Sequence, residues 1–347
     1  MRDAGCEVSS HVVDVHPSAS IRRRAKSMLQ CVEANARPGE HIHLIGHSTG
    51  GLDARLVASP TTNVSGYTVL PEVYHRIRSV TTINTPHYGT PLASFFATVS
   101  GQRVLAAVTA LTVAALTMGA PPLALTSSLV AAFGRLDRTL GVELKLIDGV
   151  VDRIVRLMDD ASSDELRSFL QQIQADQGAI IQLSPEAMDL FEAGVENNPK
   201  VLYQCTASFA PEPNLRHWSR AILSPWRSMS APIFSMLYRL TSLEHAMYPC
   251  SPGASADAAL LARLGEAPPP RASDGVVPVR SQIWGELVWA GKADHLDVVG
   301  HFHDPQDLAG RHVDWLASGS DFNRRGFDQM LDAIVKGVVA SEHRAAS

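Results

Sequence analysis

Strand-like and helix-like patterns of hydrophobic residues alternate along the first ninety residues. The segment 7–15 carries spaced valines and predicts a first strand. Ser18 or Ser20 is then expected to cap a helix of about residues 20–36, whose apolar side chains recur on one face, at Ile21, Ala25, Met28, Leu29 and Val32. The basic residues at 22–24 and 26 are then expected on the solvated face of that helix.

A βα repeat follows this helix. Residues 41–45 are an apolar run, 46–50 a glycine-flanked turn, and 51–58 a helix-forming run. The β-branched run 79–84 predicts the next strand. Strands that alternate with helices indicate a parallel sheet covered by helices on both faces.

The middle of the chain is unusually apolar. Residues 104–134 carry no charge, and Pro121-Pro122 divides them into two pieces. A membrane span needs about 20 predominantly apolar residues, and the first piece is shorter and contains threonines. We therefore expect a buried or interface-seeking helical hairpin. Helical patterns continue at 144–158 and 165–181, and Ser184-Pro185 starts another helix.

The C-terminal part returns to strand character at 201–207 and again at 283–290. Residues 211–270, with proline-rich ends, are expected to be an irregular insertion, and 327–339 an amphipathic helix. The chain is therefore divided into a first core part (1–94), an apolar helical lid insertion (95–198) and a second core part (199–347). The predicted fold class is α/β.

Composition limits the possible functions. The 347 residues are 45% hydrophobic, which is enough for one large core with an inserted subdomain. A net charge of −5 argues against a nucleic-acid partner. The four cysteines lack zinc-ligand spacing, although one disulfide stays open. The first residues contain no apolar signal segment, so the protein is expected to be cytoplasmic if Met1 is the true start, and secreted if an upstream segment is missing.

The turn at 46–50 reads Gly-His-Ser-Thr-Gly, with a strand before it and a helix after it. This context is required by the G-x-S-x-G nucleophile elbow, in which a serine sits on a sharp turn above the sheet. Gly46 and Gly50 are expected to be needed because a Cβ would collide with the neighbouring strand or helix. Ser48 is the candidate nucleophile.

A serine nucleophile needs an imidazole to accept its proton and a carboxylate to orient that imidazole. In α/β-hydrolases the three residues come in the order Ser, Asp or Glu, His. Asp274 lies on a turn before Gly275, and His295 lies on the loop after the last strand. Ser48, Asp274 and His295 thus have the expected order, each where a strand ends.

Other residues compete for these roles. Asp294, Asp297 and Asp304 are alternative acids, but Asp294 is adjacent to His295 and would have to curl back onto its ring. His301 and His303 form an H-x-H pair without an evident third ligand, so no metal site is predicted from them. The strand histidines His41 and His43 are interpreted as packing residues. His47 and His87 are expected to shape the turn and to line the substrate pocket.

Four segments together resemble the bacterial triacylglycerol lipases and esterases of the α/β-hydrolase superfamily. They are GHSTGGLDARL (46–56), TINTPHYGTPLASF (82–95), DGVVPV (274–279) and DHLDVVG (294–300). The resemblance implies a nucleophile at Ser48, an acid at Asp274 and a base at His295. It also implies that the backbone N–H of Thr49 donates to the oxyanion.

Two features of that family are not matched in full. Its members carry an upstream strand ending in a His-Gly loop, which supplies a second oxyanion donor; this sequence begins after that point and resembles an N-terminally shortened member. Several relatives bind a structural calcium through an Asp two residues after the catalytic His, and Asp297 holds that position. The second calcium ligand is not evident, Asp257 being a poor candidate, and no cofactor is required for the chemistry.

The sequence thus predicts a serine carboxylester hydrolase of lipase type that acts on lipid esters such as acylglycerols. The partners expected are an ester substrate and a transient lipid interface contacted through the lid. An acyltransferase or phospholipase with the same triad is the enzymatic alternative. A catalytically impaired lipid-binding homologue is the non-enzymatic one.

Overall fold

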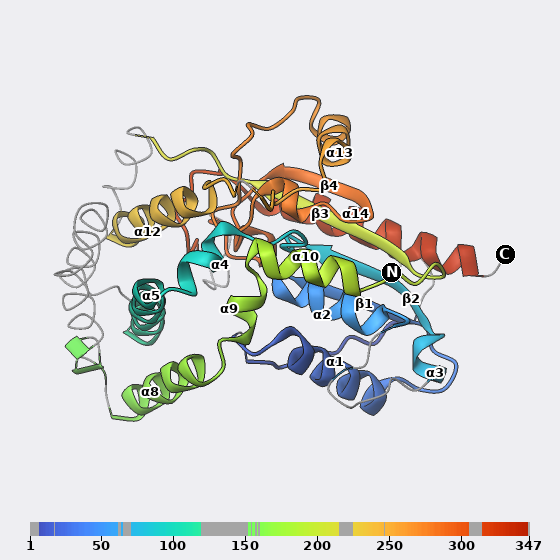
Figure 1. Cartoon of the computed structure of the whole chain (residues 1–347), viewed down its shortest axis with the longest axis horizontal. Helices are drawn as coiled ribbons and strands as arrows, with labels where there is room; N and C mark the ends of the chain where they lie inside the picture. The colour runs from blue at the N-terminus through green and yellow to red at the C-terminus, as the bar shows by residue number, and fades with distance from the viewer. Residues whose placement is uncertain are drawn as a thin grey trace.

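A four-stranded parallel sheet forms the centre of the computed structural model (Figure 1). The structure describes residues 7–16, 18–61, 64, 71–118, 152–153, 155–156, 158, 160–214, 225–245, 247–304 and 314–345. The strands lie in sequence order and are β1 (Ile42–His47), β2 (Ile77–Ile83), β3 (Leu202–Phe209) and β4 (Glu286–Lys292). Because all four run parallel, their carboxyl ends meet at one edge, where open α/β sheets place their ligands.

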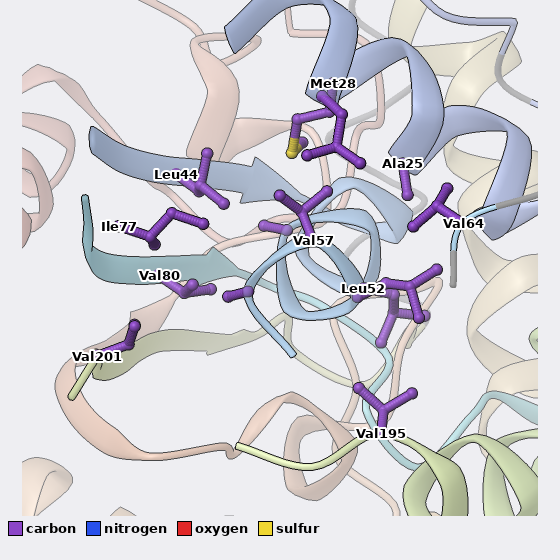
Figure 2. Close-up of a cluster of buried hydrophobic side chains, with 14 of the residues drawn as sticks. Ala25, Met28, Leu44, Leu52, Val57, Val64, Ile77, Val80, Val195 and Val201 are labelled. Carbon is purple, nitrogen blue, oxygen red and sulfur yellow. The ribbon is translucent and has the colours of Figure 1, made fainter. Parts of the chain in front are cut away.

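Helices cover both faces of this sheet. Helices α1 (Ile21–Asn35) and α2 (Thr49–Ala58) pack against one face, and α14 (Arg324–Ala345) packs against the other. Figure 2 shows Val57 of α2 between the strand residues Leu44 and Val80 and the α1 residue Met28, and Leu52 of α2 belongs to the same buried cluster. Burial of one such side chain contributes about 1.5–3 kcal/mol, so α2 is firmly held on the sheet.

The predicted first strand is wrong. Residues 7–16 have no regular structure and pair with no strand in the described chain. Val12 is 95% exposed. Spaced valines form a strand only where a neighbouring strand accepts their hydrogen bonds, and none of the described strands does.

Helix α1 begins as predicted, because the Ser20 hydroxyl accepts a hydrogen bond from the Arg23 backbone N–H. One basic residue departs from the predicted solvated face. Arg24 is buried, and its Nε donates to Asp53 Oδ2 of α2 at 2.8 Å. This ion pair joins the two helices beneath the elbow.

Helix α3 (Pro71–Tyr74) precedes β2, and α4 (Pro91–Phe96) follows it. The described part of the middle segment, 95–198, is mostly helical and contains α5 (Val99–Met118), α8 (Asp160–Ala175), α9 (Gly178–Gln182) and α10 (Pro185–Gly194). Ser184 caps α10 as predicted, accepting from the Ala187 N–H. Met188 and Val195 join the same core cluster as α1 and α2, so the last of these helices packs on the core.

Residues 119–151 lie outside the described chain, and so do the second half of the predicted hairpin and much of the 144–158 pattern. No helix in the described part combines the length and apolarity that would let it cross a bilayer.

The prediction of an irregular insertion at 211–270 is wrong for most of its described length. Two helices lie there, α12 (Pro225–Thr241) and α13 (Ala254–Leu264). Pro232 lies inside α12 and removes one backbone donor, which hides this helix from a pattern search. The last strand begins at Glu286 rather than 283, because the short helix η2 (Val279–Gln282) occupies the chain just before it. Cys31, Cys205 and Cys250 are unpaired.

Candidate active site

Ser48 joins β1 to α2 in a strained conformation. Its φ of 54° and ψ of −129° are rarely adopted by non-glycine residues and cost on the order of 1–3 kcal/mol. The turn is held because the Ser48 N–H donates to the Ile83 carbonyl at 2.9 Å. The sharp turn predicted from sequence is therefore present.

The predicted need for glycine in the elbow is confirmed at Gly46 but not at Gly50. A Cβ on Gly46 would lie 2.1 Å from the Gly50 carbonyl oxygen, so Gly46 is required. A Cβ on Gly50 would meet nothing within 4 Å, and the prediction for this residue is wrong. The second constraint falls on Gly51, whose Cβ would lie 2.1 Å from Thr85 Oγ1.

The structure brings His295 and Asp274 together. The His295 Nδ1–H donates to Asp274 Oδ2 at 2.7 Å, and the His295 backbone N–H donates to the Asp274 carbonyl. Asp274 is fully buried and His295 is 5% exposed. With Nδ1 protonated, Nε2 of the neutral ring is left as the basic nitrogen.

The loop that carries Asp274 is fixed on several sides. Asp274 Oδ1 accepts the backbone N–H groups of Val276 and Val277 at 2.9 and 2.7 Å. Gly275 adopts a φ of +94°, and a Cβ there would come within 2.7 Å of the Phe234 ring of α12. Helix α12 thus supports the acid loop, a role that the sequence did not reveal.

Two amides that the sequence did not single out also reach the acid. Asn84 Nδ2 donates to Asp274 Oδ2 at 3.0 Å, and Gln282 Nε2 donates to the same oxygen at 3.2 Å. The one available sequence signal was position, because Asn84 directly follows β2 at the carboxyl edge of the sheet.

His47 lies between the elbow and the histidine loop. Its Nε2–H donates to the His295 carbonyl at 2.9 Å, and the two ring centroids are 4.6 Å apart. Since His47 directly precedes Ser48, this contact places the His295 loop against the elbow. Burial, reinforced by the neighbouring His295, lowers the pKa of His47 to about 3.

This lowered pKa makes a prediction about acid stability. Below about pH 6.5 the unfolded chain protonates this histidine, whereas the folded chain does so only near pH 3, so stability falls as pH falls. We expect His47→Gln to reduce the slope of unfolding free energy against pH by up to about 1.4 kcal/mol per pH unit within that window. Urea unfolding at pH 4.5, 5.5 and 6.5 measures the slope.

His303→Gln is the matched control, because His303 is exposed. The slope should be unchanged in this variant. Equal slopes for His47→Gln and the unmodified protein would contradict the assignment of a buried neutral His47.

His87 does not line an open pocket in this structure. It is fully buried, and its ring stacks on Trp284. Arg55 Nη1 of α2 donates to His87 Nδ1 at 3.0 Å, and His87 Nε2–H donates to Thr82 Oγ1 at 3.0 Å. Burial and the adjacent arginine hold the pKa of His87 well below its usual value. His87 therefore holds the loop that follows β2 against α2 and Trp284.

Arg55, which contacts His87, also contacts α10. Its side chain is completely buried, lies over the Trp284 ring at 3.4 Å, and donates to Glu192 Oε1 at 2.6 Å. A buried cation of this kind requires its anionic partner, because an unpaired buried charge is strongly destabilising. Arg55 thus ties the elbow helix to the helical segment that precedes β3.

The alternative acids are engaged elsewhere. Asp294 Oδ1 accepts from the Leu296 and Asp297 N–H groups, and its Oδ2 accepts from Ser318. Asp297 Oδ2 accepts from the Asp294 N–H and from Ser320. The His295 Nδ1–H already donates to Asp274. Asp294, Asp297 and Asp304 therefore do not orient the His295 ring in this structure.

Three carboxylates gather close to the loop that carries His295. Ligand oxygens of Asp294, Asp297 and Asp314 lie within 4.8 Å of one another. Burial raises the pKa of Asp294 to about 7 and that of Asp314 to about 6, and raises that of Asp297 well above its usual value. Hard carboxylate oxygens are the ligands that calcium prefers, so this donor set fits calcium. Asp257 is not part of it and pairs instead with Arg280 at 2.7 Å.

The other predicted ligand candidates do not form a comparable group. His301 packs its ring against Trp315, and His303 is exposed. His41 and His43 lie at the start of β1, and both contact Glu342 of α14.

An apolar helical cluster adjoins the acid and base loops. Val276 and Leu296, the second residue after Asp274 and the residue next to His295, pack against it. Its buried members from α4, α5 and α12 include Leu92, Val104, Ala107, Ala110, Ile233, Phe234, Leu237 and Tyr238. The acid and base loops at the carboxyl edge of the sheet are thus bordered by a large buried apolar cluster.

Comparison with known proteins places the fold. The chain matches no protein-family model and no curated protein. Among solved structures, the Staphylococcus hyicus lipase is similar, with a TM-score of 0.51 and 16% identity over all of this chain and 88% of the lipase. A metagenomic carboxyl esterase (TM-score 0.48, 16% identity, 96% of this chain and 65% of that one) and EstA from Clostridium botulinum (0.40, 17%, 83% and 65%) also match.

This chain therefore spans just under two thirds of the length of the last two proteins. The parallel sheet, its helices on both faces and the likeness to the Staphylococcus hyicus lipase together show that the chain has the α/β-hydrolase fold, as predicted.

Proposed function

We propose that this protein is a serine carboxylester hydrolase of lipase type, with Ser48 as nucleophile, His295 as base and Asp274 as orienting acid. One observation carries the proposal. A buried Asp274–His295 pair, with Nε2 as the remaining basic nitrogen, is held against the residue that precedes a strained serine. A hydroxyl, an imidazole and a carboxylate in this arrangement form the machinery of acyl transfer.

In the proposed reaction, Ser48 Oγ attacks the ester carbonyl carbon while His295 Nε2 accepts the hydroxyl proton. The tetrahedral intermediate then collapses, its bond to the alcohol oxygen breaks, and His295 returns the proton to the leaving alcohol. Water next attacks the acyl-Ser48 ester, again giving its proton to His295. Collapse of this second intermediate breaks the bond between Ser48 Oγ and the acyl carbon, His295 returns its proton to Oγ, and the carboxylic acid leaves. Asp274 stabilises the imidazolium in both halves.

The Thr49 backbone N–H is the proposed oxyanion donor. Thr49 is the first residue of α2, so its N–H has no partner within the helix and lies at the positive end of the helix dipole. A donor in this place stabilises negative charge as it develops on the carbonyl oxygen. One such donor is worth about 10²–10³ in kcat.

The apolar cluster supports an acyl-lipid substrate. Val276 and Leu296 connect the acid and base loops to hydrocarbon side chains of α4, α5 and α12. We propose that the acyl chain packs against this cluster, and that the segment at 95–198 contacts a lipid interface. Longer chains should then gain roughly 0.8 kcal/mol for each CH₂ group buried.

Comparison of kcat/KM on p-nitrophenyl acetate and p-nitrophenyl decanoate tests this substrate class. The proposal predicts a preference for decanoate of at least about tenfold, since burial of even two CH₂ groups corresponds to that ratio. A clear preference for acetate would exclude an acyl-lipid substrate and leave a small-ester hydrolase.

We also propose that Asp294, Asp297 and Asp314 bind a structural calcium ion. Calcium would offset the negative charge of the buried Asp294 and Asp297 and the partly buried Asp314, and it would fix the loop that carries His295. At 100 times its Kd it would stabilise the folded protein by about 2.7 kcal/mol. The thermal midpoint should therefore rise when CaCl₂ replaces EGTA, and Asp297→Asn should lose the response, while Asp257→Asn keeps it. An unchanged midpoint in the unmodified protein would reject the site.

A further inference from the structure

Asn84 has a positive φ, which is uncommon for a residue other than glycine. In the described chain, the non-glycine residues with positive φ are Ser48, Asn84 and Asp321. Asn84 has a φ of 48° and is fully buried at the carboxyl end of β2. Such backbone strain persists only where the surroundings impose it, and it is concentrated at functional sites.

The side-chain contacts of Asn84 show what this conformation achieves. Its backbone N–H donates to the Thr206 carbonyl of β3 at 3.3 Å, which anchors the turn. Its Nδ2 then donates both to Asp274 Oδ2 at 3.0 Å and to Ser208 Oγ at 2.6 Å. A carboxylate can only accept, so Asp274 fixes which end of the amide faces it. Asn84 Oδ1 makes no hydrogen bond, so the amide's buried hydrogen bonds are all made by the end that faces Asp274 and Ser208.

Gln282 is the second amide that donates to the same carboxylate oxygen. Its Nε2 donates to Asp274 Oδ2 at 3.2 Å and to the Ser208 carbonyl at 3.0 Å, while its Oε1 accepts from the Ser208 N–H at 2.8 Å. Gln282 is thereby locked to the end of β3. Asn84 and Gln282 form a pair of amides that clamp Asp274 Oδ2 between β2 and β3.

The clamp determines how the carboxylate is turned. The two backbone N–H groups of the acid loop hold Oδ1, and the amides hold Oδ2 in the position where it receives the His295 Nδ1–H. Rotation of the carboxylate would break several of these bonds together. It would also displace the imidazole by a distance that matters, because a misplacement of about 1 Å can cost on the order of 10²-fold in rate.

We infer that Asn84 is a positioning residue that acts through Asp274 on the orientation of His295. The inference rests on the proposed hydrolase function. The hydrogen bonds of Asn84 go to Asp274, Ser208 and Thr206 rather than to Ser48 or the His295 ring, and its positive φ is the means by which its amide reaches the acid. Loss of the amide is expected to lower the rate of acylation and to leave substrate affinity unchanged.

Two substitutions separate this role from a merely structural one. Asn84→Gly removes the amide at a φ that glycine adopts freely. Asn84→Asp keeps the shape and tolerates the backbone, but it places a carboxylate oxygen against Asp274 Oδ2 unless a proton is shared between the two acids. Asp321→Gly is the control, because it relieves the same backbone strain at an exposed position.

The measurements are kcat and KM for p-nitrophenyl butyrate, the rate of Ser48 labelling by a fluorophosphonate, and the thermal midpoint. For Asn84→Gly we expect kcat and the labelling rate to fall together by about 10- to 100-fold, with KM within twofold and a midpoint close to that of Asp321→Gly. For Asn84→Asp, activity relative to the unmodified protein should rise as pH is lowered from 8 to 5.5, because the shared proton restores a donor.

Unchanged kcat in Asn84→Gly would overturn the inference. So would a loss of kcat that is matched by Asp321→Gly, or an Asn84→Asp ratio that does not vary with pH. Failure of the proposed function gives a different result, since the unmodified protein would then not be labelled at Ser48 at all.

Discussion

Replacement of Ser48 by alanine is expected to lower kcat on p-nitrophenyl esters by at least about 10⁴-fold, because the acyl-enzyme can no longer form. The fold should survive, since alanine removes only the hydroxyl and the elbow is held by the Ser48 backbone N–H bond to the Ile83 carbonyl. Initial rates with p-nitrophenyl butyrate, at matched protein concentration, measure the effect.

Ser255→Ala is the control for this change, because it removes the same group from an exposed position of α13. Its rate should equal that of the unmodified protein. Residual activity of Ser48→Ala above a few per cent would show that another residue carries the reaction.

Replacement of Asp274 by asparagine is expected to lower kcat by about 10⁴-fold, with a small change in KM. In a serine protease the corresponding change leaves the site geometry intact but stabilises the wrong imidazole tautomer. Here the effect is reinforced, because both oxygens of Asp274 accept only N–H donors, so the NH₂ group of an asparagine would face donors whichever way its amide is turned. The pH dependence of kcat/KM measures how far the base is impaired.

Asp257→Asn is the matched control, since Asp257 is half exposed and pairs with Arg280 on the surface. It should leave kcat within twofold. If Asp274→Asn retained more than a tenth of the activity, a different acid would have to orient His295, and Asp274 would lose its proposed role.

Local signals in the sequence were sufficient for the elbow and its surroundings. The run 41–58 contains strand, turn and helix within one window, and the Ser20 and Ser184 caps lie directly beside their helices. Such features depend on neighbours in the chain and can be predicted without tertiary structure. The pairing of Asp274 with His295 was predicted from order and loop position, and the two side chains are joined at 2.7 Å.

Features that depend on distant partners escaped prediction. The valines near residue 12 have strand spacing but no neighbouring strand in the described chain. Arg24 follows the polar face of α1 in sequence, yet Asp53 of α2 draws it inward. Asn84 and Gln282 are ordinary polar residues in sequence, and their contacts with Asp274 arise only when the ends of β2 and β3 meet the acid loop.

Reaction with a fluorophosphonate, followed by intact mass and peptide mapping, tests the central claim most directly. Such a probe phosphonylates, with loss of fluoride, only a serine that is activated by its neighbours, so it reports the Ser48–His295–Asp274 arrangement without knowledge of the natural ester. The account predicts one adduct per chain, located on Ser48, absent in Ser48→Ala and slowed in Asp274→Asn. No adduct on the folded unmodified protein, or an adduct that persists in Ser48→Ala, would contradict it.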